Sequence, residues 1–306
     1  MEAELNAVTL DMGSAGDSAL AIALALMMLA VALGLKKENF VAVKDRPKPY
    51  FAGAAAQIIG LPLLTLLILF IINPLPSLAL GMIIVASCPG GTVSNLITLL
   101  GRGNTALSVS LTATSSLLAA FITPISILFW CSLYPPTANL LNEIDFNTVE
   151  FLTNLMLILG LPIFIGMIIS AKAPVLAAKL QRITAAVGAV LLLVIIVIAL
   201  SAFSDTILKF GYLIIPLVIV HNGAAFLLGY ISARLAGSDI SERRALTIET
   251  GIQNSGIAIV ILLTQLKGLG GAAAIAGIWG TWHIIAGLIL VGIWRSLDRK
   301  KRRANA

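Results

Sequence analysis

The sequence predicts an all-α membrane protein, and three of its features support this fold class. It is 59% hydrophobic and 11% charged, with a mean hydropathy of +1.03, whereas soluble domains carry about 25% charged residues. Nine separate stretches are apolar and long enough for a membrane span, which needs roughly 20 residues. Lys and Arg gather between these stretches on one predicted side of the membrane. These features exclude an ordinary soluble protein.

The nine predicted transmembrane helices cover residues 18–35, 50–73, 78–100, 105–131, 149–170, 184–203, 211–234, 244–266 and 272–294. With the N-terminus outside, 18 of the 20 Lys and Arg residues lie inside, and only Lys209 and Lys267 lie outside. Because cytoplasmic loops are rich in Lys and Arg, this asymmetry supports both the count and the orientation. The first 17 residues hold four acids and no base, so the first stretch is expected to remain as a span instead of acting as a cleaved signal peptide.

The net charge of +6 does not indicate a nucleic-acid partner, because the basic residues separate apolar segments and form no polar face. The basic run at 299–303 is either a positive-inside signal or an anchor to anionic lipids. Cys88 and Cys131 are too few for a disulfide framework or a thiolate metal site. Membrane lipids are the expected surroundings, and no obligatory protein partner is evident.

Short polar segments interrupt two of the predicted spans. Residues 88–95 (CPGGTVSN) lie within the third span, and residues 249–256 (ETGIQNSG) lie within the eighth. Proline removes a backbone donor and glycine frees the chain, so both helices should break there. Unwound backbone persists at membrane depth only where protein or a water-filled cavity satisfies it. Each break is therefore predicted to form part of a binding site.

The positions of the breaks predict an internal repeat. Spans one to four and six to nine form two groups, each with its broken helix third, and span five connects them. Because five spans separate the partners, the groups have opposite orientations. Two inverted repeats with crossed discontinuous helices are typical of secondary transporters.

Glu249 is the only acidic residue placed in the hydrocarbon region. A charge there costs about 2.5–3.5 kcal/mol on insertion scales, so it needs a partner, and no Lys or Arg is placed at that depth. Oxygen groups are available nearby, from Ser94 and Asn95 in the first break and, on the fourth span, from Ser108, Thr112 and Ser115 or Ser116. Oxygen ligands suit a hard cation, and a single carboxylate best balances a monovalent one.

Each of these residues also has a plainer interpretation. Hydroxyls are ordinary small groups at helix interfaces in membranes, and Glu249 can be a protonated structural carboxyl. Gln57 is either a ligand or an interhelical hydrogen-bonding residue. His283 is a substrate contact, a proton carrier or a residue of the interfacial aromatic belt.

The residues after Gly91 supply helix N-terminal amides, which bind carboxylates and other anions. A site that offers oxygen to a cation and amides to an anion is suited to carrying an organic anion together with sodium. A sodium/proton antiporter is the alternative, although such a protein would normally use a pair of carboxylates. An enzyme is not expected, because no nucleophile and base stand at a recognisable spacing. A channel is not expected either, because no filter motif appears.

Three stretches, read together, resemble a known family. Residues 86–95 (ASCPGGTVSN), 102–108 (RGNTALS) and 249–256 (ETGIQNSG) are similar to the signature stretches of the bile acid:sodium symporter family, and His221-Asn222-Gly223 fits as well. The resemblance implies one transporter domain over residues 1–306. Its core would comprise spans at about 50–131 and 211–294, where the broken helices cross. Its panel would comprise about 18–35, 149–170 and 184–203, and would rock against the core for alternating access.

The resemblance also implies two sodium ions and the residues that hold them. The first ion would be bound by Ser94, Asn95, Ser108, Thr112 and Glu249. The second would be bound by Gln57, Gln253 and Glu249, with the backbone carbonyls of Thr250 and Ile252. An organic anion would lie between core and panel, near Thr92, Asn254 and His283.

Members of this family differ in the number of spans and in substrate. Many bacterial members have ten spans, and this chain lacks the helix before the first predicted span, which belongs to the panel. The substrates of the family include bile acids and small carboxylates such as pyruvate, and the sequence does not choose between them. The expected location is a bacterial inner membrane, with the N-terminus outside and the C-terminus in the cytoplasm.

Overall fold

The fold is built from helices throughout the part of the chain that the structure describes. This computed structural model describes residues 13–144, 146–202, 204–266 and 268–304, so most of the acidic N-terminal segment and Lys267 lie outside the described residues. The elements in order are α2 (Gly13–Gly34), η1 (Lys37–Phe40), α3 (Val41–Asp45), α4 (Pro47–Ala55), η2 (Ala56–Gly60), α5 (Leu61–Ile72), α6 (Pro76–Ser87), α7 (Val93–Leu100), α8 (Thr105–Leu133), α9 (Pro135–Glu143), α10 (Thr148–Leu155), η3 (Met156–Gly160), α11 (Leu161–Lys172), α12 (Pro174–Ala202), α13 (Ser204–Leu235), α14 (Ile240–Gly251), α15 (Ser255–Gln265) and α16 (Gly270–Ala304).

Apolar helices of spanning length confirm a membrane protein. Six helices in the described residues are long and apolar enough to cross a bilayer, and a seventh is added if the bent pair Ser18–Gly34 and Glu38–Asp45 is one span. The remaining two of the nine predicted spans are the interrupted ones, each divided into two short helices. Nine crossings therefore remain a prediction.

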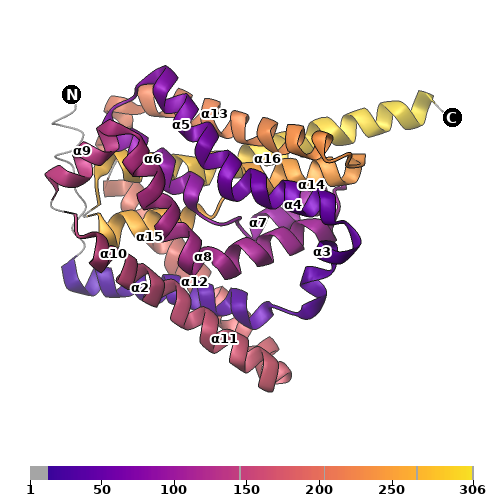
Figure 1. Ribbon diagram of the computed structural model, residues 1–306, viewed down its shortest axis with the longest axis horizontal. Helices are drawn as coiled ribbons and strands as arrows, with labels where there is room; N and C mark the ends of the chain where they lie inside the picture. Colours follow the sequence, from indigo (N-terminus) through magenta and orange to yellow (C-terminus); the bar gives the residue numbers. More distant parts are fainter. Residues whose placement is uncertain (1–12, 145, 203, 267, 305–306) are drawn as a thin grey trace.

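Three helices extend well beyond their predicted spans. α12 begins at Pro174, ahead of the predicted 184, α13 begins at Ser204, ahead of the predicted 211, and α16 continues to Ala304. A helix does not have to end at the membrane surface, because Lys and Arg side chains along it are solvated by water and headgroups. The far end of α16 projects beyond the other helices (Figure 1).

The helices form two groups. α2 packs on α11 and α12, and in Figure 1 α2 and α11 lie along the lower edge of the molecule. α5, α13 and α16 lie along the upper edge, with α7 and α8 between the two edges.

Large apolar side chains on the outer surfaces, such as Phe70, Phe121 and Phe164, are more than half exposed. Large apolar side chains that are exposed on the outer surfaces suit contact with lipid.

Both predicted breaks are present. α6 ends at Ser87, Cys88 is extended, and α7 begins at Val93. α14 ends at Gly251, Ile252 is extended, and α15 begins at Ser255. Between the two breaks, Gly90 and Gln253 form an isolated antiparallel bridge. The broken helices therefore meet through their unwound segments.

Two π-helical turns occur in the same sequence context in the two halves of the chain. η2 and η3 each end in glycine, and each is followed by Leu-Pro, at Leu61-Pro62 and Leu161-Pro162. Because proline has no N–H to donate, a wider turn accommodates the missing hydrogen bond. Gln57 lies within η2, so the turn affects where its side chain points.

Candidate functional site

Three hydroxyl groups surround the buried carboxylate of Glu249. Oε1 accepts hydrogen bonds from Ser94 Oγ at 2.5 Å and from Ser108 Oγ, and Oε2 accepts one from Thr112 Oγ1 at 2.8 Å. All four side chains are at most 4% exposed. α7 supplies Ser94, α8 supplies Ser108 and Thr112 one turn apart, and α14 supplies Glu249.

Asn95 completes this group. Its Oδ1 lies 2.8 Å from Ser108 Oγ and 3.4 Å from Thr112 Oγ1, within hydrogen-bond distance of both. All five side chains predicted to hold the first ion therefore lie together. We name them the carboxylate cluster: Ser94, Asn95, Ser108, Thr112 and Glu249.

The carboxylate cluster has the chemistry of a cation site. No ion pair involves Glu249 among the described residues, where Glu242 pairs with Arg46 and Asp298 with Arg102 and Arg244. A hydroxyl both donates and accepts, so the three that now donate to the carboxylate can rotate and offer lone pairs to a cation. A buried carboxylate without an ionic partner is costly, which favours a bound cation.

The residues predicted for a second ion lie on the other side of Glu249. Gln57 Nε2 donates to the backbone carbonyl oxygen of Glu249 at 3.2 Å, and Gln253 Nε2 donates to that of Thr250 at 2.9 Å. The carbonyl of Ile252 accepts from Gly91 N at 3.2 Å. In the part of the chain that the structure describes, the buried amide oxygens of Gln57 and Gln253 have no hydrogen-bond partner. Buried oxygen atoms without donors are the kind that a cation satisfies.

Gly90 lies where these two sets of residues meet. A Cβ atom on Gly90 would lie 2.7 Å from Gln57 Nε2 and 3.2 Å from Glu249 Oε2. The absence of a Cβ therefore lets the break approach both side chains as they stand, and a larger residue would displace the end of Gln57. Next to this glycine, Asn254 N of the second break donates to the Pro89 carbonyl of the first at 2.8 Å, which holds the two breaks together.

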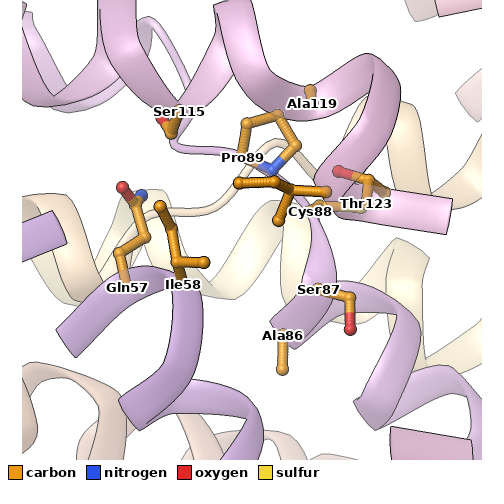
Figure 2. Close-up of a pocket in the computed structure, with 10 residues that line it drawn as sticks. Gln57, Ile58, Ala86, Ser87, Cys88, Pro89, Ser115, Ala119 and Thr123 are labelled. Carbon is orange, nitrogen blue, oxygen red and sulfur yellow. The ribbon is translucent and has the colours of Figure 1, made fainter. Parts of the chain in front are cut away.

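A small cavity adjoins Gln57 (Figure 2). Gln57 and Ile58 extend from one helix and Ser115, Ala119 and Thr123 from another, with Cys88 and Pro89 between them. The cavity offers about 10 Å³ to the centre of a water molecule, which is room for about one.

The three predicted substrate residues are placed less closely together. Thr92 is exposed and precedes α7, and its side chain makes no capping hydrogen bond. Asn254 is half-buried and caps α15, accepting from Ile257 N at 3.2 Å. These two residues flank the paired breaks. His283 is buried in α16, and within the described residues its Nδ1 has no hydrogen-bond partner and it makes no hydrogen bond to Thr92 or Asn254.

A larger cavity of about 550 Å³ lies where α2, α11 and α12 approach α8. It is mostly apolar, with Lys36, Ser170 and Gln181 as its polar lining. None of the three predicted substrate residues lines it.

Other residues support the site without having been singled out for it. Thr98, one turn after Ser94 in α7, is buried, and its Oγ1 lies 3.3 Å from Ser108 Oγ. Asn222 Nδ2 donates to the Gly251 carbonyl at 2.7 Å, at the end of α14. The signal for Thr98 was its spacing of four residues from Ser94, and the signal for Asn222 was a polar residue in an apolar span.

Apolar helices of spanning length and a polar site buried between them define a multi-pass membrane protein of the transporter class. The chain belongs to the sodium bile acid symporter family, whose model matches residues 21–210.

Relatives across this family are named as sodium-dependent carriers. An uncharacterised sodium-dependent transporter of Bacillus subtilis is 31% identical over 94% of this chain and 86% of its own length. A protein of Arabidopsis thaliana named as a probable chloroplast sodium/metabolite cotransporter is 29% identical over 90% of this chain and 66% of its own length. The human ileal sodium/bile acid cotransporter is 28% identical over 80% of this chain and 69% of its own length. These likenesses support sodium-coupled symport.

Proposed function

We propose that this protein is a sodium-coupled symporter that carries an organic anion by alternating access. The observation that carries the proposal is the buried Glu249 carboxylate, which meets hydroxyls from two other helices at the point where two broken helices pair. The names of its relatives support the same chemistry.

Two sodium ions fit the oxygen groups best. The carboxylate cluster would hold the first ion. Gln57 and Gln253, with the carbonyls of Thr250 and Ile252 and with Glu249, would hold the second. The unpartnered amide oxygens of the two glutamines support this second site.

The crossing of the two breaks would belong to a core domain of the predicted spans at about 50–131 and 211–294. The panel would be formed by α2, α10 with α11, and α12, whose mutual packing supports the division. Rocking of one domain against the other would expose the site first to one side of the membrane and then to the other. The C-terminus would be cytoplasmic and the membrane a bacterial inner membrane. A C-terminal reporter enzyme that is active only outside the cell would contradict this orientation.

The organic anion would bind beside the breaks. Thr92 is exposed at the start of α7, after the first break, and Asn254 caps the helix after the second. Helix N-terminal amides favour an anionic group there. His283 would contact the anion from α16, which packs against the second break where Gly280 meets Ser255 and Gly287 meets Ile252. Bile acids and small carboxylates are both candidates, because relatives named for bile acid and for metabolite transport match the chain similarly.

Uptake into proteoliposomes tests the function. A panel of labelled bile acids and small carboxylates is offered under an inward sodium gradient and again with choline in place of sodium. At least one anion should accumulate only with sodium, and Glu249→Ala should abolish that uptake. Uptake that is equal in choline would overturn the proposal. Sodium-driven proton flux without any organic solute would support an antiporter instead.

A further inference from the structure

Ser115 ties the first break to α8 through two hydrogen bonds. Its Oγ accepts from the backbone N–H of Gly90 at 3.2 Å and donates to the carbonyl oxygen of Thr112 at 3.2 Å. The side chain is 6% exposed, so water competes little for either bond. The N–H of Gly90 lies in the unwound segment, where no helix supplies an acceptor for it.

The Gly90 peptide is in contact with residues of both proposed cation sites. It lies against Gln57 of the second site and Glu249 of both, and it bridges to Gln253 across the pair of breaks. On its other side, Ser115 follows Thr112 in the same helix by three residues. Ser115 therefore connects a turn of α8 that holds the first ion to a peptide that borders the second.

We propose that Ser115 is a positioning residue that couples the two cation sites; because it needs an ion at each, this inference rests on the proposed function. A cation that draws Thr112 and Glu249 together orders the turn of α8 that carries Ser115. Because Ser115 holds the Gly90 N–H, the break is ordered with that turn. The amide oxygens of Gln57 and Gln253 are then held in place for the second ion. Coupling of this kind is reciprocal, so either ion favours the other.

The cavity beside Ser115 allows a matched pair of variants. Ser115 and Gln57 both line it, so a methyl group added at Ser115 has space to enter. Thr and Val have nearly the same shape and differ in the hydroxyl. Ser115→Thr keeps the acceptor for Gly90, and Ser115→Val removes it. Ser110→Ala is a control in the same helix, since the Ser110 hydroxyl donates to the Ala106 carbonyl one turn earlier in α8.

Thermal unfolding of the full chain in detergent, with sodium chloride replacing choline chloride at constant ionic strength, measures the coupling. We expect Ser115→Thr and Ser110→Ala to follow the wild type in both the half-stabilising sodium concentration and the Hill coefficient. Ser115→Val should need roughly two- to tenfold more sodium, and its Hill coefficient should fall toward that of independent sites.

Ser115→Val overturns the inference if its sodium midpoint and Hill coefficient match those of Ser115→Thr. A lower melting temperature in choline with an unchanged sodium response overturns it as well, because that result shows a packing role alone. If the valine variant does not fold, Ser115→Ala takes its place against the same threonine variant. If the wild type itself shows no sodium-dependent stabilisation, the proposed function fails first, and the two failures are distinguishable.

Discussion

Gln57 donates a hydrogen bond from Nε2 to the backbone carbonyl oxygen of Glu249 at 3.2 Å. The carboxylate of the same glutamate accepts hydrogen bonds from hydroxyls on α7 and α8. Glu249 therefore contacts residues of both proposed sites, and its carboxylate would bridge the two ions. Removing the side chain of Gln57 should affect one site, whereas changing Glu249 should affect both.

Gln57→Ala should remove the second ion and leave the first. The Hill coefficient for sodium-dependent stabilisation should fall from about two, for two coupled sites, to about one. Sodium titration followed by thermal unfolding measures it. Gln265→Ala is the matched control, because Gln265 lies at the end of α15 and bonds to Asn154 and Thr264. A Hill coefficient that stays near two in Gln57→Ala would show that Gln57 is a structural residue.

Glu249→Gln should remove the sodium response altogether. The amide retains hydrogen-bonding capacity for the surrounding hydroxyls but removes a buried charge that has no ionic partner in the described residues. Neutralising such a charge relieves its desolvation cost. The variant should therefore melt at or above the temperature of the wild type in choline and should not be stabilised by sodium. Sodium-dependent stabilisation of wild-type size in Glu249→Gln would remove Glu249 from both sites.

Gly90→Ala should distort both sites at once. The added Cβ would lie 2.7 Å from Gln57 Nε2, so either the break or the glutamine must shift. Sodium-dependent stabilisation and uptake should both be lost or strongly reduced. Gly292→Ala in α16 is the control, because nothing lies within 4 Å of a Cβ built there. Wild-type uptake by Gly90→Ala would show that the break has room that its geometry does not indicate.

The sequence allowed the site to be predicted where local chemistry dictates structure. Proline and glycine end a helix wherever they occur, so the break at 88–95 and its counterpart at 249–256 could be located. A lone glutamate in an apolar span requires oxygen or positive charge near it, and Ser108 and Thr112 stand one turn apart on a helix. Pairing of the breaks was inferred from their positions in the two halves of the chain, and the bridge between Gly90 and Gln253 agrees with it.

Features set by packing between distant segments could not be predicted in this way. The sequence shows Gly-Leu-Pro after Gln57, but proline alone does not distinguish a kink, an end or a π-helical turn. Ser115 and Ser116 were equivalent candidates until the structure showed which of them faces Gly90. The surroundings of His283 could not be predicted either, because the rotation of α16 depends on its neighbours and not on its own composition.

An ion pair at the start of α14 should stabilise the fold without affecting sodium binding. Arg46 Nε lies 2.6 Å from Glu242 Oε1, and Glu242 also accepts from the Asp239 N–H in a capping box. Glu242 is 1% exposed, whereas Arg46 is half exposed. Glu242→Ala should destabilise the protein by about 1–3 kcal/mol through loss of charged hydrogen bonds.

The melting temperature of Glu242→Ala in choline should therefore fall, while its half-stabilising sodium concentration stays unchanged. Lys44→Ala, at an exposed position in α3, serves as the control. A changed sodium midpoint in Glu242→Ala would mean that the two turns between Glu242 and Glu249 transmit strain to the site.

Lys36 should assist the anion at the cavity that adjoins α2. It contributes the positive charge to a mostly apolar lining of α2, α11 and α12, at the end of α2 that is predicted to face the cytoplasm. A carboxylate in this cavity would be attracted to it, with the modest energy of a solvent-exposed pair. Lys36→Gln should raise the half-saturating anion concentration by roughly two- to fivefold when the anion is offered from the cytoplasmic face.

Transport by inside-out and right-side-out membrane vesicles separates the two faces. The effect should appear only in the inside-out vesicles and weaken as salt rises, and Lys44→Gln should not reproduce it. An equal change from both faces would place Lys36 in the general folding of the protein and leave this cavity without a role in anion release.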